Sequence, residues 1–111
     1  MKLKPTLPTT ALILTLAWPI SHGLAADADA GKTAYEKNCA GCHGADGKGN
    51  PAVAKTLGEK ELNIVGKETK QKSDEVLLKV IAEGSGKMPA NKKLTKDEQK
   101  AVLQYSRSLA K

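Results

Sequence analysis

Apolar residues recur at helical spacing between Ser73 and Gly84 and predict an amphipathic helix there. The apolar positions of this segment are Val76, Leu77, Leu78, Val80 and Ile81. Ser73 is a favourable N-cap, and the acidic Asp74 and Glu75 follow it, where the positive end of the helix dipole stabilises negative charge. Gly84 is placed to end the helix.

A second amphipathic helix is expected from Thr95 to the end of the chain. Thr95-Lys96-Asp97-Glu98 is a capping box, in which the first and last side chains satisfy free backbone N–H groups. The buried stripe of this helix is predicted to consist of Val102, Tyr105 and Leu109, with Leu103 beside it.

The segment from about Asp27 to Cys42 is also predicted to be helical, with Asp27 or Asp29 as its cap. One side of it carries, at helical spacing, Gly31, Tyr35, Asn38, Cys39 and Cys42. Residues 44–51 form a loop rich in turn residues, residues 53–65 a short helix or turns, and residues 67–72 a solvated connector. No segment alternates with period two, so the expected fold class is all-α, with three clear helices and a fourth, shorter one.

The first 26 residues have the order of a secretory signal peptide. Lys2 and Lys4 precede an apolar run over residues 11–20, and the small residues Ala25 and Ala26 follow it. An uncleaved membrane anchor is the alternative, but about ten apolar residues are fewer than the roughly 20 that a bilayer requires. We therefore expect cleavage after Ala26, with Ala25 as the second choice, and export to the periplasm or an equivalent compartment. Residues 27–111 then form the single folded domain.

Residues 27–111 contain little with which to fill a core. Tyr35 and Tyr105 are their only aromatic residues. Domains this small often need a metal, a disulfide or another stabilising cross-link, so a large apolar group from outside the chain is expected.

The 16 basic and 12 acidic residues of this segment, residues 27–111, leave it with a weak positive charge. Such a balance suits an acidic partner surface or solubility, and it is too interspersed for nucleic-acid binding.

Cys39-Ala40-Gly41-Cys42-His43 is the pattern of covalent c-type haem attachment. Residues 39, 42 and 43 share one face of a helix. Two thiols so placed can form thioethers to the two vinyl groups of one porphyrin, while the imidazole of His43 faces the iron. The sequence therefore predicts one covalent haem c, with its iron.

Three other interpretations of the two cysteines are weaker. A disulfide between Cys39 and Cys42 would close a very small loop and add little stability. A thioredoxin-like redox pair requires a βαβ context, and a zinc site would lack a second Cys/His pair.

Met88 is the only methionine of residues 27–111, and it lies in the loop Gly84–Pro89. Methionine usually fills gaps in a core, but such a residue normally lies on the apolar stripe of an element. Because no second histidine accompanies His43, the sixth iron position falls to Met88, a lysine or water. We favour Met88, whose thioether would raise the reduction potential.

In these features the chain resembles the class I c-type cytochromes over essentially all of residues 27–111. The resemblance implies a cytochrome c fold, with three to four helices wrapped around one covalently bound haem and with crossing N- and C-terminal helices. Gly31 and Tyr35 would meet Tyr105 at that crossing. Cys39 and Cys42 would bind the haem, and His43 and Met88 its iron. In this family a proline carbonyl after the motif commonly accepts a hydrogen bond from the proximal imidazole; Pro51 could fill that role or be an ordinary turn residue.

An iron closed on both faces has no position for substrate, so a single-electron carrier, not an enzyme, is expected. A haem-bearing subunit or domain of a larger periplasmic oxidoreductase is the alternative, and a haem ligand sensor is a weaker one. The partners would be redox proteins with acidic docking surfaces. The protein itself is expected to be a monomer, with no stable membrane insertion after the signal peptide is cleaved. The lysines that could ring an exposed haem edge are Lys48, Lys87, Lys92 and Lys93.

Overall fold

The fold is helical throughout the part of the chain that the structure describes. A computed structural model describes residues 2–5, 8 and 23–110. Its helices are α1 (Gly23–Asn38), α2 (Ala40–His43), α3 (Pro51–Leu57), α4 (Glu59–Leu62), α5 (Lys67–Gln71), α6 (Asp74–Glu83) and α7 (Lys96–Leu109). These residues form no strand and only an isolated bridge between Ser85 and Met88. The all-α prediction is confirmed.

Two of the long helices begin where local capping signals place them. The Ser73 hydroxyl accepts a hydrogen bond from the Val76 N–H at the start of α6, which ends at Gly84. At the start of α7 the capping box is complete: Thr95 Oγ1 accepts from the Glu98 N–H, and Glu98 Oε2 accepts from the Thr95 N–H. Both predicted starts are confirmed, because caps depend only on neighbours in sequence.

The N-terminal helix differs from its prediction at both ends. It starts at Gly23, not at Asp27 or Asp29, and breaks at Cys39, so that α2 follows as a separate turn. The predicted leader lies, except for residues 2–5, 8 and 23–26, outside the described residues. No helix among the described residues combines the length and the hydrophobicity that a membrane span requires.

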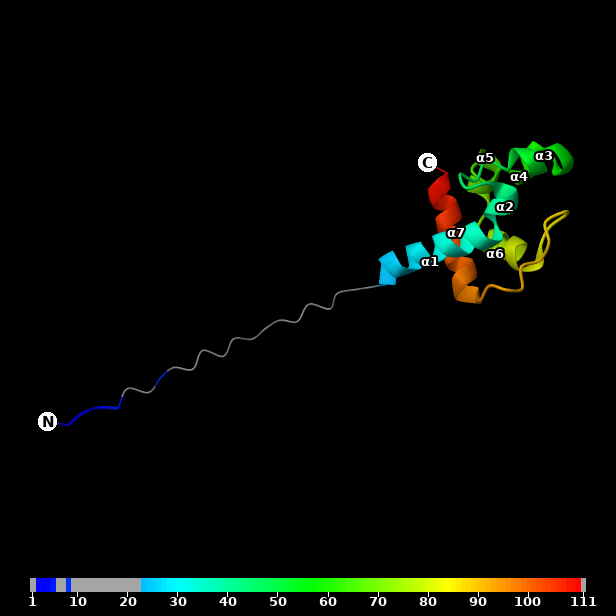
Figure 1. The fold of residues 1–111 in the computed structure, drawn as a ribbon. Coiled ribbons are helices and arrows are strands. Elements are labelled where there is room, and N and C mark those ends of the chain that lie inside the picture. Colours follow the sequence, from blue (N-terminus) through cyan, green and yellow to red (C-terminus); the bar gives the residue numbers. More distant parts are fainter. Residues whose placement is uncertain (1, 6–7, 9–22, 111) are drawn as a thin grey trace.

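The two terminal helices cross closely, as predicted (Figure 1). At the crossing a Cβ atom on Gly31 would collide with the carbonyl oxygen of Ala101 and would lie 3.3 Å from Tyr105 Cβ. The rings of Tyr35 and Tyr105 meet with centroids 5.2 Å apart and planes tilted by 56°. Glycine is thus required at position 31 because the two backbones touch there.

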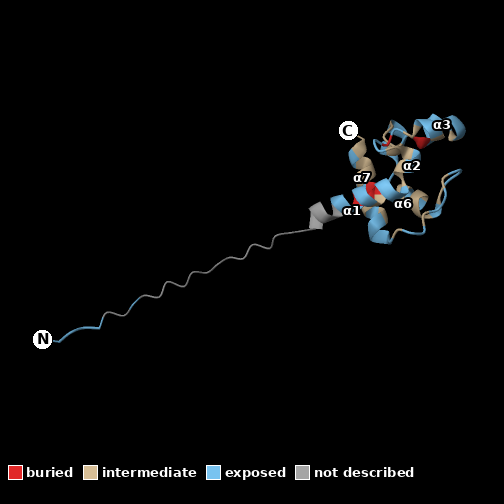
Figure 2. Cartoon of the chain, viewed as in Figure 1, coloured by how far each residue is buried: buried red, intermediate tan, exposed pale blue. Residues whose placement is uncertain are grey.

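The buried core is small and centres on this crossing (Figure 2). Among the described residues the buried hydrophobic side chains are Tyr35, Leu62, Val102 and Leu103. Tyr105 and Leu109, which were predicted to be buried, are only half-buried. The prediction for Val102 is confirmed, and Leu103, which was placed beside the stripe, is buried as well.

The middle of the chain is more helical than predicted. Residues 51–62 form α3 and α4, in agreement with a short helix or turns, but the predicted solvated connector at residues 67–72 contains α5. This prediction was wrong because Lys67–Gln71 has no apolar periodicity to reveal a helix. The structure thus has several short helices where one fourth helix was expected.

Candidate functional site

Cys39, Cys42 and His43 lie on one helical turn directly after α1. The N–H groups of Cys42 and His43 donate to the Cys39 carbonyl at 3.2 and 3.0 Å. Cys39 is half-buried, Cys42 is exposed, and both are free thiols. Burial raises the pKa of the Cys39 thiol. The structure thus places two unpaired thiols and an imidazole on the same turn.

The His43 ring is oriented by a main-chain carbonyl. Its Nδ1 lies 2.7 Å from the carbonyl oxygen of Leu62. A carbonyl can only accept, so Nδ1 carries the proton and donates it, and the lone pair of Nε2 is left free for a metal. Leu62 itself is buried at the end of α4, which fixes the position of the acceptor.

Pro51 does not supply this carbonyl, so that suggested role for it was wrong. Pro51 is instead the first residue of α3, where its missing N–H costs nothing, and Asn50 caps the helix by accepting from the Ala52 N–H at 3.0 Å. The Asn-Pro pair could have indicated this helix start. No side-chain signal could have indicated Leu62, because every residue has a carbonyl.

Tyr35 connects the helix crossing to the residue that follows His43. Its hydroxyl donates to the Gly44 carbonyl at 2.7 Å, and the side chain is fully buried. Burial, with smaller effects from Cys39, Tyr105 and Asp46, raises the pKa of the Tyr35 hydroxyl well above its usual range. Tyr35 therefore stays protonated and holds Gly44 at neutral pH.

Met88 lies in a tight reverse turn after α6. The N–H groups of Ser85 and Met88 each donate to the other residue's carbonyl, at 3.0 and 2.9 Å. Gly84, at φ +80°, lies directly beneath the returning chain: an added Cβ would collide with the Met88 carbonyl oxygen and approach Pro89 C to 2.9 Å. Backbone contacts of the turn thus fix the position of Met88, which is half-buried.

The donor set and the surrounding apolar surface fit a covalently bound haem. Two free thiols flank a turn whose Gly41 has open space beside it, and Nε2 of His43 is available as an iron ligand. Many apolar side chains of α3, of α6 and of the segment between α4 and α5 are only half-buried: Val53, Leu57, Ile64, Val65, Leu77, Leu78, Val80 and Ile81. Such surface is normally covered, and a haem would cover part of it.

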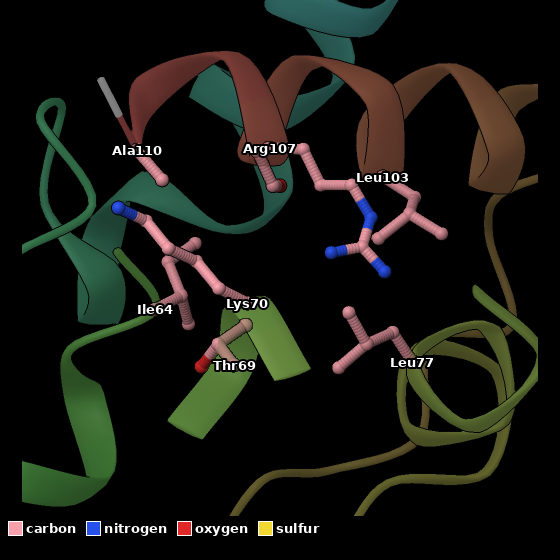
Figure 3. A pocket seen from close by; sticks show the side chains of 8 residues that line it. Ile64, Thr69, Lys70, Leu77, Leu103, Arg107 and Ala110 are labelled. Carbon is pink, nitrogen blue, oxygen red and sulfur yellow. The ribbon is translucent and has the colours of Figure 1, made fainter. Parts of the chain in front are cut away.

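A separate cavity of about 290 Å³ lies between α5, α6 and α7 (Figure 3). Its wall includes Arg107, which bonds to Asp74 Oδ1 through Nε at 2.8 Å and to the Lys72 carbonyl through Nη2 at 2.8 Å. Neither the two cysteines nor His43 nor Met88 lines it. The arginine joins the three helices there.

Comparison with known proteins identifies the family of the chain. Residues 26–105 match the family described as cytochrome c oxidase, cbb3-type, subunit III. The chain is also 40% identical over 81 residues to cytochrome c6 of Leptolyngbya boryana, covering 72% of this chain and 89% of that protein. The chain therefore belongs to the class I c-type cytochromes and is an electron-transfer protein with covalently bound haem c.

Proposed function

We propose that this chain is a soluble carrier of single electrons, with a haem attached through Cys39 and Cys42 and its iron held by His43 and Met88. The observation that carries the proposal is the hydrogen bond from His43 Nδ1 to Leu62, because it leaves Nε2 free beside two free thiols. When bound, the haem iron supplies a one-electron couple between the ferric and ferrous states.

The chain's residues would keep both faces of the iron closed. His43 is held in one orientation by Leu62, and the turn at Ser85–Met88 fixes the backbone that bears the thioether. A closed iron leaves no site for a substrate, so electrons would leave through contact with a partner. Met88 would also raise the reduction potential, since a neutral thioether favours the ferrous state.

Carbon monoxide binding and the Met88→Ala variant test this proposal. The wild-type ferrous protein should bind carbon monoxide poorly at neutral pH, because the gas must first displace Met88. Met88→Ala should bind it readily, lose the weak far-red band of sulfur-to-iron charge transfer, and have a lower reduction potential. Rapid binding by the wild type, or an unchanged spectrum in Met88→Ala, would refute the ligation.

A second candidate is a haem-bearing subunit of a larger oxidoreductase. The description of the matching family, cytochrome c oxidase, cbb3-type, subunit III, favours it. Size-exclusion chromatography of gently extracted native protein separates the two: a carrier elutes at the mass of one small domain, and a subunit elutes with its complex.

We further propose a periplasmic location and acidic docking partners. Residues 1–26 would be removed as a signal peptide by cleavage after Ala26 or Ala25. Residues 27–111 would then form the haem domain, and the mature protein would be a monomer. Mass spectrometry of the exported protein should find one haem on a chain that begins at about Asp27. The side chains that would meet a partner, Lys48, Lys87, Lys92 and Lys93, are exposed.

A further inference from the structure

The last three carbonyl groups of α2 find their hydrogen-bond partners outside the helix. Gly41 accepts from Asn50 Nδ2 at 2.9 Å, Cys42 from the Asn50 N–H at 2.9 Å, and His43 from the Gly49 N–H at 2.7 Å. A single helical turn is not stable alone in water. The shape of the turn that bears both cysteines and His43 therefore depends on the loop that folds back onto it.

Asn50 supplies two of these three bonds and starts the next helix with the same side chain. Its Oδ1 accepts from the Ala52 N–H at 3.0 Å, and its carbonyl accepts from the Ala54 N–H at 2.9 Å. The side chain must donate on one side and accept on the other within a short reach. An amide can do both, whereas an ionised aspartate can only accept, and a serine has a single hydroxyl on a shorter side chain.

We propose that Asn50 is a positioning residue for the haem-attachment turn, acting through the bond from its amide to the Gly41 carbonyl. The bond fixes the orientation of the turn that carries His43. It also offsets the partial negative charge of a carbonyl that lies two residues before His43 in the chain, and such charge would favour the ferric state. The inference rests on the proposed ligation of iron by His43, and it assigns to Asn50 an influence on the reduction potential.

Asn50→Ser and Asn50→Ala separate the two roles of this side chain in the haem-loaded protein. Serine keeps the cap of α3 but is too short to reach Gly41, and alanine loses both bonds. If the Gly41 bond matters, both variants should have a lower reduction potential than the wild type, by similar amounts. Both should also shift the NMR resonances of the His43 ring in the ferric protein. Only Asn50→Ala should show the additional fall in thermal midpoint caused by loss of the cap.

Thr95→Ala is the matched control, since it removes the N-cap of α7 and touches no group of α2. It should lower the thermal midpoint and leave the potential and the His43 resonances unchanged. The proposal is overturned if serine restores wild-type potential and resonances, if both Asn50 variants have wild-type values, or if Thr95→Ala shifts them equally. Should Asn50→Ala yield no holoprotein, Asn50→Ser alone decides. Failure of the proposed ligation would appear in the wild type itself, because the His43 ring resonances would lack the large paramagnetic shift that bound ferric iron causes.

Discussion

Individual side chains around His43 act largely on main-chain groups. The imidazole donates to the Leu62 carbonyl, the Tyr35 hydroxyl to the Gly44 carbonyl, and the Asn50 amide to the Gly41 carbonyl. Each of these bonds lies within or beside the turn that carries the two thiols. The turn is therefore held from three directions, by α1, by α4 and by the start of α3.

Tyr35→Phe should destabilise the holoprotein by about 0.5–1.5 kcal/mol, the net worth of one hydrogen bond, because the Gly44 carbonyl still accepts from the Gly47 N–H at 3.2 Å. The ring and its contact with Tyr105 remain, so the loss reports on the hydroxyl alone. Tyr105→Phe is the control: among the described residues its hydroxyl makes no hydrogen bond, and the change should stay within about 0.5 kcal/mol. Denaturant unfolding measures both, and equal effects would contradict this account.

The difference in stability between wild type and Tyr35→Phe should also depend on pH. The folded state raises the pKa of Tyr35, whereas in the unfolded chain it titrates at about 10. The stabilisation is therefore complete below about pH 10 and is lost as the pH rises further. Unfolding measured up to pH 11 should show the two proteins converging, and a constant difference would count against the assignment.

Gly84→Ala should displace Met88. The added Cβ would meet main-chain atoms of Met88, Pro89 and Ala90, which cannot yield without moving the turn. The expected results are a weaker far-red band and faster carbon monoxide binding. Gly86→Ala is the control within the same turn, since it also has positive φ but nothing within 4 Å of its added Cβ. Equal effects of the two substitutions would show that backbone strain, not collision with Met88, is responsible.

Among the elements, the crossing of α1 and α7 is the main tertiary contact. Gly31 brings the two backbones together, and the tyrosine rings pack beside it. The short helices α3, α4 and α5 bury little: among them only Leu62 is a buried residue. The stability of the polypeptide without haem therefore depends mainly on this helix pair.

Gly31→Val should reduce the free energy of unfolding by about 1–3 kcal/mol or more, the usual cost of overpacking. Val would force α1 away from Ala101, so the Tyr35–Tyr105 contact should weaken as well. Gly66→Ala provides the comparison, because its φ is −75° and the nearest atom to an added Cβ is 3.8 Å away. Thermal unfolding of both holoproteins tests the contact, and a wild-type midpoint in Gly31→Val would exclude it.

Elements with local signals were the ones that sequence could predict. Ser73 and Thr95 mark the starts of α6 and α7 through neighbours three residues away. The crossing at Gly31, Tyr35 and Tyr105 was predicted from the resemblance to the class I c-type cytochromes, not from a local signal. By contrast, α5 is stabilised without an apolar stripe. The Leu62 carbonyl is brought to His43 by the fold of an intervening loop, which no local pattern encodes.

For the molecule as a whole, the small buried core and the half-buried apolar side chains point to a fold completed by its haem. The exposed lysines Lys48, Lys87, Lys92 and Lys93 take part in none of the ion pairs found among the described residues. Their charges are thus available to a partner.

Reduction by an acidic redox partner should slow as salt rises. Screening shortens the Debye length from roughly 30 Å at 0.01 M to about 10 Å at 0.1 M, which weakens the steering of partners by these lysines. Stopped-flow rates for Lys87→Gln and Lys93→Gln should fall below wild type at low salt and converge with it at high salt. Lys55→Gln, in α3, is the comparison. A rate independent of salt would contradict the acidic-partner proposal.

The crossing of α1 and α7 joins the first and last helices of the described fold. During synthesis the chain emerges from its N-terminus, so Gly31 and Tyr35 are made long before Ala101 and Tyr105. Until α7 is present, the buried face of α1 has no partner. A product that stops short of Lys96 would keep Tyr35 exposed to water and would be open to proteases. The same contact that stabilises the finished protein thus distinguishes finished chains from unfinished ones.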